Sequence, residues 1–169
     1  RIMVFKGLIA AAPSADALAG VLAHEIAHVE ERHSLKHILR SLGTLQFAGA
    51  AVGGGIDGFE AAETIVELSS GLLILKHSRN HEREADRVAV KRLIDAGRRP
   101  SGLIEFFEVI EDELASMPAP PQWMSTHPLT KERIADVEAL IEESADGRDV
   151  EALATPWMTQ AEWETFQQL

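Results

Sequence analysis

The stretch SADALAGVLAHEIAHVEERHSLKHILRS, residues 14–41, predicts a long helix that carries the most informative side chains of the chain. Ser14 is a suitable N-cap, and Asp16 stands in the first turn, where a negative charge is favoured. We expect the helix to continue to the end of this stretch, because Gly43 just beyond it is a common stop signal.

Within this predicted helix, residues 24–28 read His-Glu-Ile-Ala-His, the pattern H-E-x-x-H. Residues four apart lie about 40° apart around a helix, so the imidazoles of His24 and His28 point the same way and can hold one zinc ion. Glu25 lies about 100° round, which suits a general base that acts on a metal-activated water. The bare pattern also occurs by chance in many helices, so a third ligand is needed to support it.

The third ligand has to be a histidine or a carboxylate, because the chain has no cysteine. The position six residues after His28 is Ser34, and the position nineteen residues after it is Phe47, so two familiar spacings fail. Glu82 and Asp86 are four apart on a second predicted helix. Glu82 can complete a three-ligand site, with Asp86 hydrogen-bonded to a ligand imidazole. The alternative is a solvated helix face with internal ion pairs.

The rest of the chain is expected to be mainly helical. Further helices are predicted over residues 60–96 and 101–117, over a segment capped by Ser125 or Thr126 that lasts to about residue 144, and after Thr159, which forms a capping-box pattern with Glu162. An edge strand is predicted over Ile2–Ile9, which is rich in β-branched and aromatic residues. The glycine-rich residues 43–58 fit either a flap over a cleft or a closely packed helix.

Composition narrows the function classes. The 169 residues carry 16 basic and 27 acidic side chains, a formal net charge of -11, which argues against nucleic acid as the main partner. The longest apolar stretch, residues 42–56, is too short to span a membrane alone. The chain opens on Arg1, so we interpret it as a piece of a longer protein. We expect a catalytic domain over residues 1–145 and a C-terminal extension with a short helix over residues 146–169.

Three ordered blocks together resemble one known family. They are H-E-x-x-H-x-x-x-R-H over residues 24–33, S-R-x-x-E-x-E-A-D over residues 78–86, and S-T-H-P-x-x-x-x-R-I over residues 125–134. This combination is similar to the gluzincin family of HtpX and the CAAX prenyl protease, above all to its soluble bacterial envelope branch. The resemblance covers roughly residues 5–142.

The resemblance implies a thermolysin-like helical core with a small sheet, most of which would lie upstream of Arg1. It implies zinc on His24, His28 and Glu82, with Glu25 as the catalytic base and Asp86 behind a ligand histidine. The expected activity is zinc-dependent hydrolysis of peptide bonds in protein substrates. The expected location is the bacterial envelope, periplasmic or membrane-associated, with envelope assembly proteins as candidate partners. The alternative is a helical, chaperone-like binding module whose zinc site is latched or silent.

His127 has three possible roles that the sequence does not separate. It could be a fourth zinc ligand that latches the site, a hydrogen-bond donor to the oxyanion of the tetrahedral intermediate, or an ordinary helix-start histidine. Arg79 and Arg133 are candidate structural or substrate-positioning cations, with free surface charge as the alternative for each. His33 is predicted to be a hydrogen-bonded core histidine.

Overall fold

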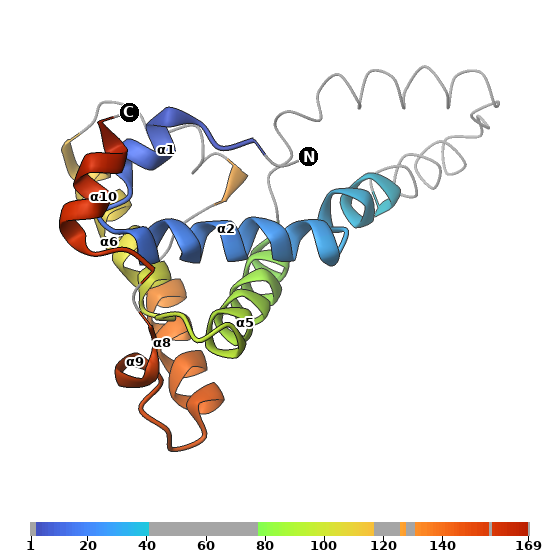
Figure 1. The fold of residues 1–169 in the computed structure, drawn as a ribbon. Helices are drawn as coiled ribbons and strands as arrows, with labels where there is room; N and C mark the ends of the chain where they lie inside the picture. Colours follow the sequence, from blue (N-terminus) through green and yellow to red (C-terminus); the bar gives the residue numbers. More distant parts are fainter. Residues whose placement is uncertain (1–2, 41–77, 117–125, 128–130, 156, 169) are drawn as a thin grey trace, which may run out of the picture.

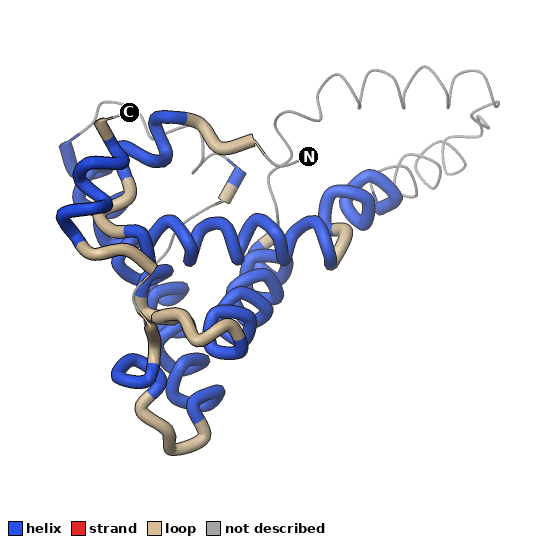
Figure 2. Tube along the Cα trace, viewed as in Figure 1, coloured by secondary structure: helices blue, strands red, loops and turns tan. Residues whose placement is uncertain are grey.

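The computed structural model describes residues 3–40, 78–116, 126–127, 131–155 and 157–168, and all regular structure in these ranges is helical (Figures 1 and 2). The fold class is therefore mainly α, as predicted. The helices in these ranges include α1 (Lys6–Ala11), α2 (Ala15–Glu30), α5 (Arg79–Asp95), α6 (Gly102–Ser116), α8 (Lys131–Ala145), α9 (Val150–Leu153) and α10 (Gln160–Gln167). The expectations for residues 43–58 and for Ser125 lie outside the described residues.

The predicted strand over Ile2–Ile9 is wrong, because residues from Lys6 onwards form α1. Tertiary contacts explain the difference. The side chain of Gln167 in α10 donates to the carbonyl of Ile9 at 2.8 Å, and the Trp163 indole donates to the carbonyl of Ala12 at 3.2 Å. These donors satisfy carbonyls at the end of α1 that a helix leaves unpaired. Figure 1 shows α1 and α10 side by side at one end of the molecule.

Helix α2 begins where the sequence predicts, with the Ser14 hydroxyl accepting from the amide of Ala17 at 3.0 Å. It does not continue to Ser41. The helix ends at Glu30, the chain turns at Glu31 and Arg32, and residues 33–40 form a new helical segment. Arg32 has a positive φ of 52°, which no α-helix accommodates.

The helix that carries the second block also differs from the prediction. Ser78 is its N-cap, in an extended conformation, so α5 starts afresh there and is not a continuation of a helix from residue 60. α6 lies within one residue of its predicted limits. The Thr159–Glu162 capping box at α10 is confirmed, and the short α9 was not predicted.

One hydrophobic cluster joins α2, α5, α6, α8 and α10. Its fully buried members include Val21, Val90, Phe106, Phe107, Val137 and Trp163. Because Trp163 belongs to this cluster, α10 packs on the same core as α2 and α5, which carry the first two sequence blocks. The division at residue 145 stays a prediction.

α2 and α6 approach so closely that only glycine fits at their crossing. A Cβ on Gly20 would lie 2.6 Å from the Leu103 amide nitrogen, and a Cβ on Gly102 would lie 2.3 Å from the Asp16 carbonyl oxygen. Both neighbours are backbone atoms and cannot rotate away. This contact fixes the position of α2 one turn before His24.

Candidate metal centre

The centre forms where α2 packs against α5. His24 and His28 project from the buried side of α2, as their spacing predicts, and their Nε2 atoms lie 2.9 Å apart. Glu82, in the first turn of α5, faces both of them. One of its carboxylate oxygens is 3.5 Å from His24 Nε2 and the other is 3.4 Å from His28 Nε2. Two imidazoles and one carboxylate therefore meet at one buried point.

His127 closes the same group from a third segment of the chain. It is buried, and its Nδ1 lies 3.3 Å from each carboxylate oxygen of Glu82. Its Nε2 lies 3.5 Å from the carboxylate of Glu25, which is itself partly exposed. Within the described residues, His24, His28, Glu82 and His127 are the one group that could hold a metal ion, with a candidate atom from each within 4.8 Å of the others.

The spacing of these donors suits zinc. Four tetrahedral ligands at about 2.0–2.2 Å from a zinc ion lie roughly 3.3–3.6 Å from one another. Oε1 of Glu82 lies 3.4 Å from His28 Nε2 and 3.3 Å from His127 Nδ1, and the other oxygen, Oε2, lies 3.5 Å from His24 Nε2. The 2.9 Å between the Nε2 atoms of His24 and His28 would have to widen by a few tenths of an ångström. Imidazole nitrogen and carboxylate oxygen are also the ligands that zinc accepts in a site without cysteine.

Asp86 lies behind His24, one helical turn beyond Glu82. Its carboxylate is 2.9 Å from His24 Nδ1, so it accepts a hydrogen bond there, and in the neutral imidazole that a metal would bind, Nε2 then keeps its lone pair. The sequence predicted a contact of this kind.

Arg133 of α8 is buried beside the two carboxylates and is not a surface charge. Its Nη1 lies 2.7 Å from Glu82, while Nε and Nη2 lie 2.6 and 2.8 Å from the two oxygens of Asp86. Its guanidinium carbon sits 4.6 Å above the ring centroid of Phe107, a cation–π contact. Arg79, in contrast, is exposed at the first position of α5 and makes none of the contacts described for the centre.

The surroundings keep both carboxylates ionised. Burial alone would raise the pKa of Glu82, but hydrogen bonds from His127 and His24 and the charge of Arg133 hold that pKa well below its ordinary value. Burial opposes ionisation of Asp86 in the same way, and Arg133 and His24 lower its pKa despite this. Negative oxygens at Glu82 and Asp86 are what a cation at this centre requires.

His33 is the residue whose part in the centre the sequence did not reveal. It is buried and hydrogen-bonded, as predicted, but its partner is a candidate ligand, since its Nδ1 lies 2.9 Å from Nδ1 of His28. The prediction placed it on a continuous helix, about 140° away from His28. Neither a capping residue nor a glycine marks this turn in the sequence, because the residue with the positive φ is Arg32.

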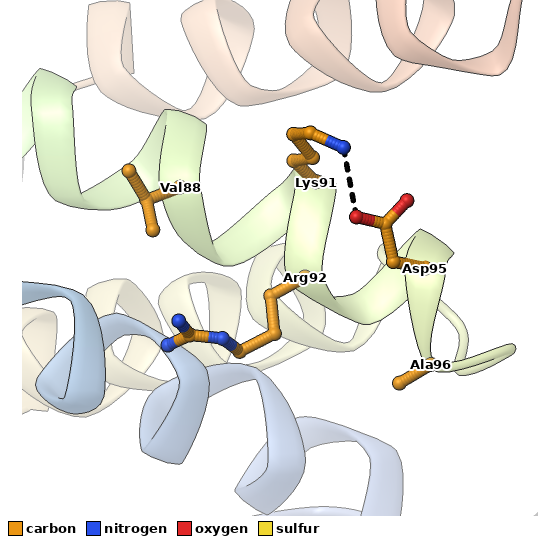
Figure 3. Close-up of a pocket in the computed structure, with 5 residues that line it drawn as sticks. All are labelled: Val88, Lys91, Arg92, Asp95 and Ala96. Atoms are coloured by element: carbon orange, nitrogen blue, oxygen red, sulfur yellow. Dashed lines mark hydrogen bonds and ion pairs between the residues drawn. The ribbon is translucent and has the colours of Figure 1, made fainter.

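The hollow shown in Figure 3 is separate from this chemistry. Val88, Lys91, Arg92, Asp95 and Ala96 of α5 line it, and none of them is a candidate ligand. Lys91 and Asp95 form an ion pair at 2.8 Å along one side of the helix, an ordinary surface arrangement.

A helical domain in which an H-E-x-x-H helix and a carboxylate from a second helix meet at one buried point is the arrangement of a metal-dependent peptidase. The sequence comparison agrees. The model of peptidase family M48 matches residues 1–141, and the chain belongs to this family.

Similar proteins come from bacteria and from mitochondria. The beta-barrel assembly-enhancing protease of Escherichia coli is 27% identical over 147 residues, which cover 80% of this chain and 29% of that protein. A Vibrio cholerae protein with the same name in provisional form is 34% identical over 146 residues, again 80% of this chain and 29% of the relative. The mitochondrial metalloendopeptidase OMA1 of Schizosaccharomyces pombe is 31% identical over 154 residues, which cover 88% of this chain and 43% of the relative.

The chain thus spans less than a third of the length of these bacterial relatives. Among the described residues, no helix combines the length and the apolar character needed to cross a bilayer.

Proposed function

We propose that this chain is the catalytic domain of a zinc-dependent endopeptidase that hydrolyses peptide bonds in protein substrates. The observation that carries the proposal is the meeting of His24, His28 and Glu82 at one buried point with Glu25 beside it. Membership of a peptidase family and the protease names of the relatives support the same reaction class.

We assign the zinc ligands to His24, His28 and Glu82. When bound, a zinc ion would act as a Lewis acid that polarises the substrate carbonyl and makes water a nucleophile at neutral pH. Glu25 is then placed to take the proton of the attacking water on its carboxylate and to deliver it to the leaving amine, which requires no covalent intermediate.

Asp86 and Arg133 support these roles without touching substrate. Asp86 accepts from Nδ1 of His24 and so keeps Nε2 available to the metal. Arg133 neutralises part of the charge of Glu82 and Asp86 and fixes the orientation of both carboxylates through three contacts of 2.6–2.8 Å.

For His127 we favour the latch over the other two roles. It is buried, it contacts Glu82 through Nδ1, and its Nε2 faces the carboxylate of Glu25. In this position it would compete with water for the metal, and it also contacts the carboxylate of Glu25, the proposed general base. His127→Ala should therefore raise hydrolysis while weakening zinc affinity. A lower rate with unchanged affinity would favour the oxyanion role, and no change in either would favour a structural role.

The decisive experiment combines metal content with cleavage of casein or a labelled peptide. The wild type should hold about one zinc ion per chain and cleave in a way that a chelator blocks. Glu25→Gln should keep the zinc and lose hydrolysis, whereas Glu82→Ala should lose or greatly weaken zinc binding. Glu30→Gln, on the same helix but exposed, is the matched control and should keep both.

Two outcomes would refute the proposal in different ways. Cleavage that survives in Glu25→Gln would remove the proposed mechanism. Zinc without any cleavage, in both the wild type and His127→Ala, would favour the alternative of a binding module with a silent site.

We further propose a bacterial envelope location, with envelope assembly proteins as candidate partners. The support is the name of the bacterial relatives, which refers to beta-barrel assembly. Fractionation of cells that produce the whole protein would test the location. The competing outcome is a mitochondrial location, as in the name of the Schizosaccharomyces pombe relative.

A further inference from the structure

The two candidate histidine ligands are held from behind in different ways. Nδ1 of His24 meets the carboxylate of Asp86 directly. Nδ1 of His28 instead meets Nδ1 of His33 at 2.9 Å, and Nε2 of His33 lies 3.1 Å from the carboxylate of Glu84. His28 therefore reaches a carboxylate through a second imidazole.

The end of α2 makes this contact possible. In a continuous helix His33 would follow His28 by five positions and point about 140° away from it. The turn at residues 31–32, with the positive φ of Arg32, brings the His33 ring back beneath His28, with the ring centroids 4.8 Å apart. On its other side, His33 stacks on His81 with centroids 4.5 Å apart and planes 13° from parallel.

The hydrogen bonds of His28 and His33 assign one tautomer to each imidazole ring. A histidine that binds metal through Nε2 must carry its hydrogen on Nδ1, so His28 donates to Nδ1 of His33. His33 then carries its own hydrogen on Nε2 and donates to Glu84. With neutral rings, both contacts are satisfied only in this direction, and Nε2 of His28 then carries no hydrogen, as metal binding through this atom requires.

We propose that His33, anchored by Glu84, is a positioning residue of the metal centre that fixes the tautomer and ring orientation of His28. The inference rests on the proposed zinc site. It assigns to His33 and Glu84 the part that Asp86 plays behind His24. Outer partners of ligand histidines are worth about 10–100-fold in metal affinity.

The test measures the dissociation constant for zinc by competition with a chelating dye, and the visible spectrum of the cobalt-substituted protein. His33→Phe keeps a flat ring against His81 but removes both nitrogens, and should weaken zinc binding by about 10–100-fold. Glu84→Ala changes a side chain that is 42% exposed, so the fold is not at risk. It should weaken zinc binding by about 10-fold, the low end of the range.

A conservative variant separates positioning from packing. In His33→Asn, the side-chain oxygen stands near the place of Nδ1 and can accept from His28, so affinity and the cobalt spectrum should recover most of the way to wild type. Glu138→Gln, which removes an exposed carboxylate from α8, is the matched control and should change neither readout.

The outcomes distinguish this inference from the proposed function. A wild type that binds no zinc overturns both. A wild type that binds zinc, with affinities within twofold in His33→Phe and Glu84→Ala, overturns only the positioning role. Equal losses in His33→Phe and His33→Asn also overturn it, because packing alone would then explain them. If His33→Phe does not fold, Glu84→Ala and His33→Asn decide the question.

Discussion

Replacing Gly20 by alanine tests the contact that sets α2 against α6. The new Cβ would lie 2.6 Å from the amide nitrogen and 2.7 Å from the Cα of Leu103. Ordinary contacts of a Cβ begin at 3.4 Å, so the two helices would have to separate by roughly 0.8 Å. Both opposing atoms belong to the backbone, and a rotamer change cannot relieve the overlap.

The expected free-energy change combines two opposing effects. Alanine gains about 1 kcal/mol over glycine inside a helix. Overpacking a tight contact costs typically 1–3 kcal/mol, and we take the upper end because the neighbours are backbone atoms. The net loss is then about 2 kcal/mol. With an m-value of about 2 kcal/mol/M, the urea midpoint should fall by about 1 M.

Gly7→Ala is the matched control, because Gly7 also lies in a helix but has nothing within 4 Å of its added Cβ. It should be neutral or stabilising by up to about 1 kcal/mol. Both variants should be unfolded in urea with a chelator present, so that metal binding does not add to the difference. A Gly20→Ala midpoint equal to or above that of Gly7→Ala would show that the helix crossing is not as tight as described.

Three further changes probe the core, the buried charges and the pH dependence. Trp163→Ala removes a buried side chain and its bond to the Ala12 carbonyl, so it should cost about 3–5 kcal/mol in urea unfolding; a loss below 1 kcal/mol would show that α10 is not part of the core. Arg133→Met leaves Glu82 and Asp86 buried without their cation, and the metal-free protein should lose about 3–5 kcal/mol; calorimetry showing an unchanged melting temperature would contradict this. Burial raises the pKa of Asp16, so its ionisation opposes folding at pH 7, and this cost disappears below the unfolded pKa of about 3.9. Asp16→Asn should thus gain stability relative to wild type at pH 7 more than at pH 3.5, and equal differences at the two pH values would refute the assignment.

The proximity of His24 to His28, and of Glu82 to Asp86, could be predicted because each pair depends on local helix geometry. The spacing of His24 and His28 places both on one side of any α-helix, and the same holds for Glu82 and Asp86. The caps at Ser14 and Thr159 are equally local, since each acts on amides within three residues. Patterns of this kind are set before the chain packs, so the sequence alone reveals them.

The features that the sequence did not reveal depend on tertiary contacts. Residues 6–9 have strand-forming character but become helical, with the carbonyls at the end of α1 accepting from Gln167 and Trp163, about 155 residues later. No glycine marks the turn at Arg32 in the sequence. The burial of Arg133 follows from carboxylates on α5, which a pattern along α8 alone does not show.

The four donors of the centre come from three stretches of chain that lie far apart in the sequence. His24 and His28 are four residues apart, whereas Glu82 and His127 are separated by 45. An unfolded chain does not hold Glu82 and His127 beside the histidine pair, so a metal ion bound to all four donors would favour the folded state and add to its stability. Synthesis from the N-terminus imposes an order on the same assembly. A ribosome-bound chain that ends before residue 82 carries His24, Glu25 and His28 but not Glu82, so the group of candidate ligands is complete only after more than half of the chain has been made.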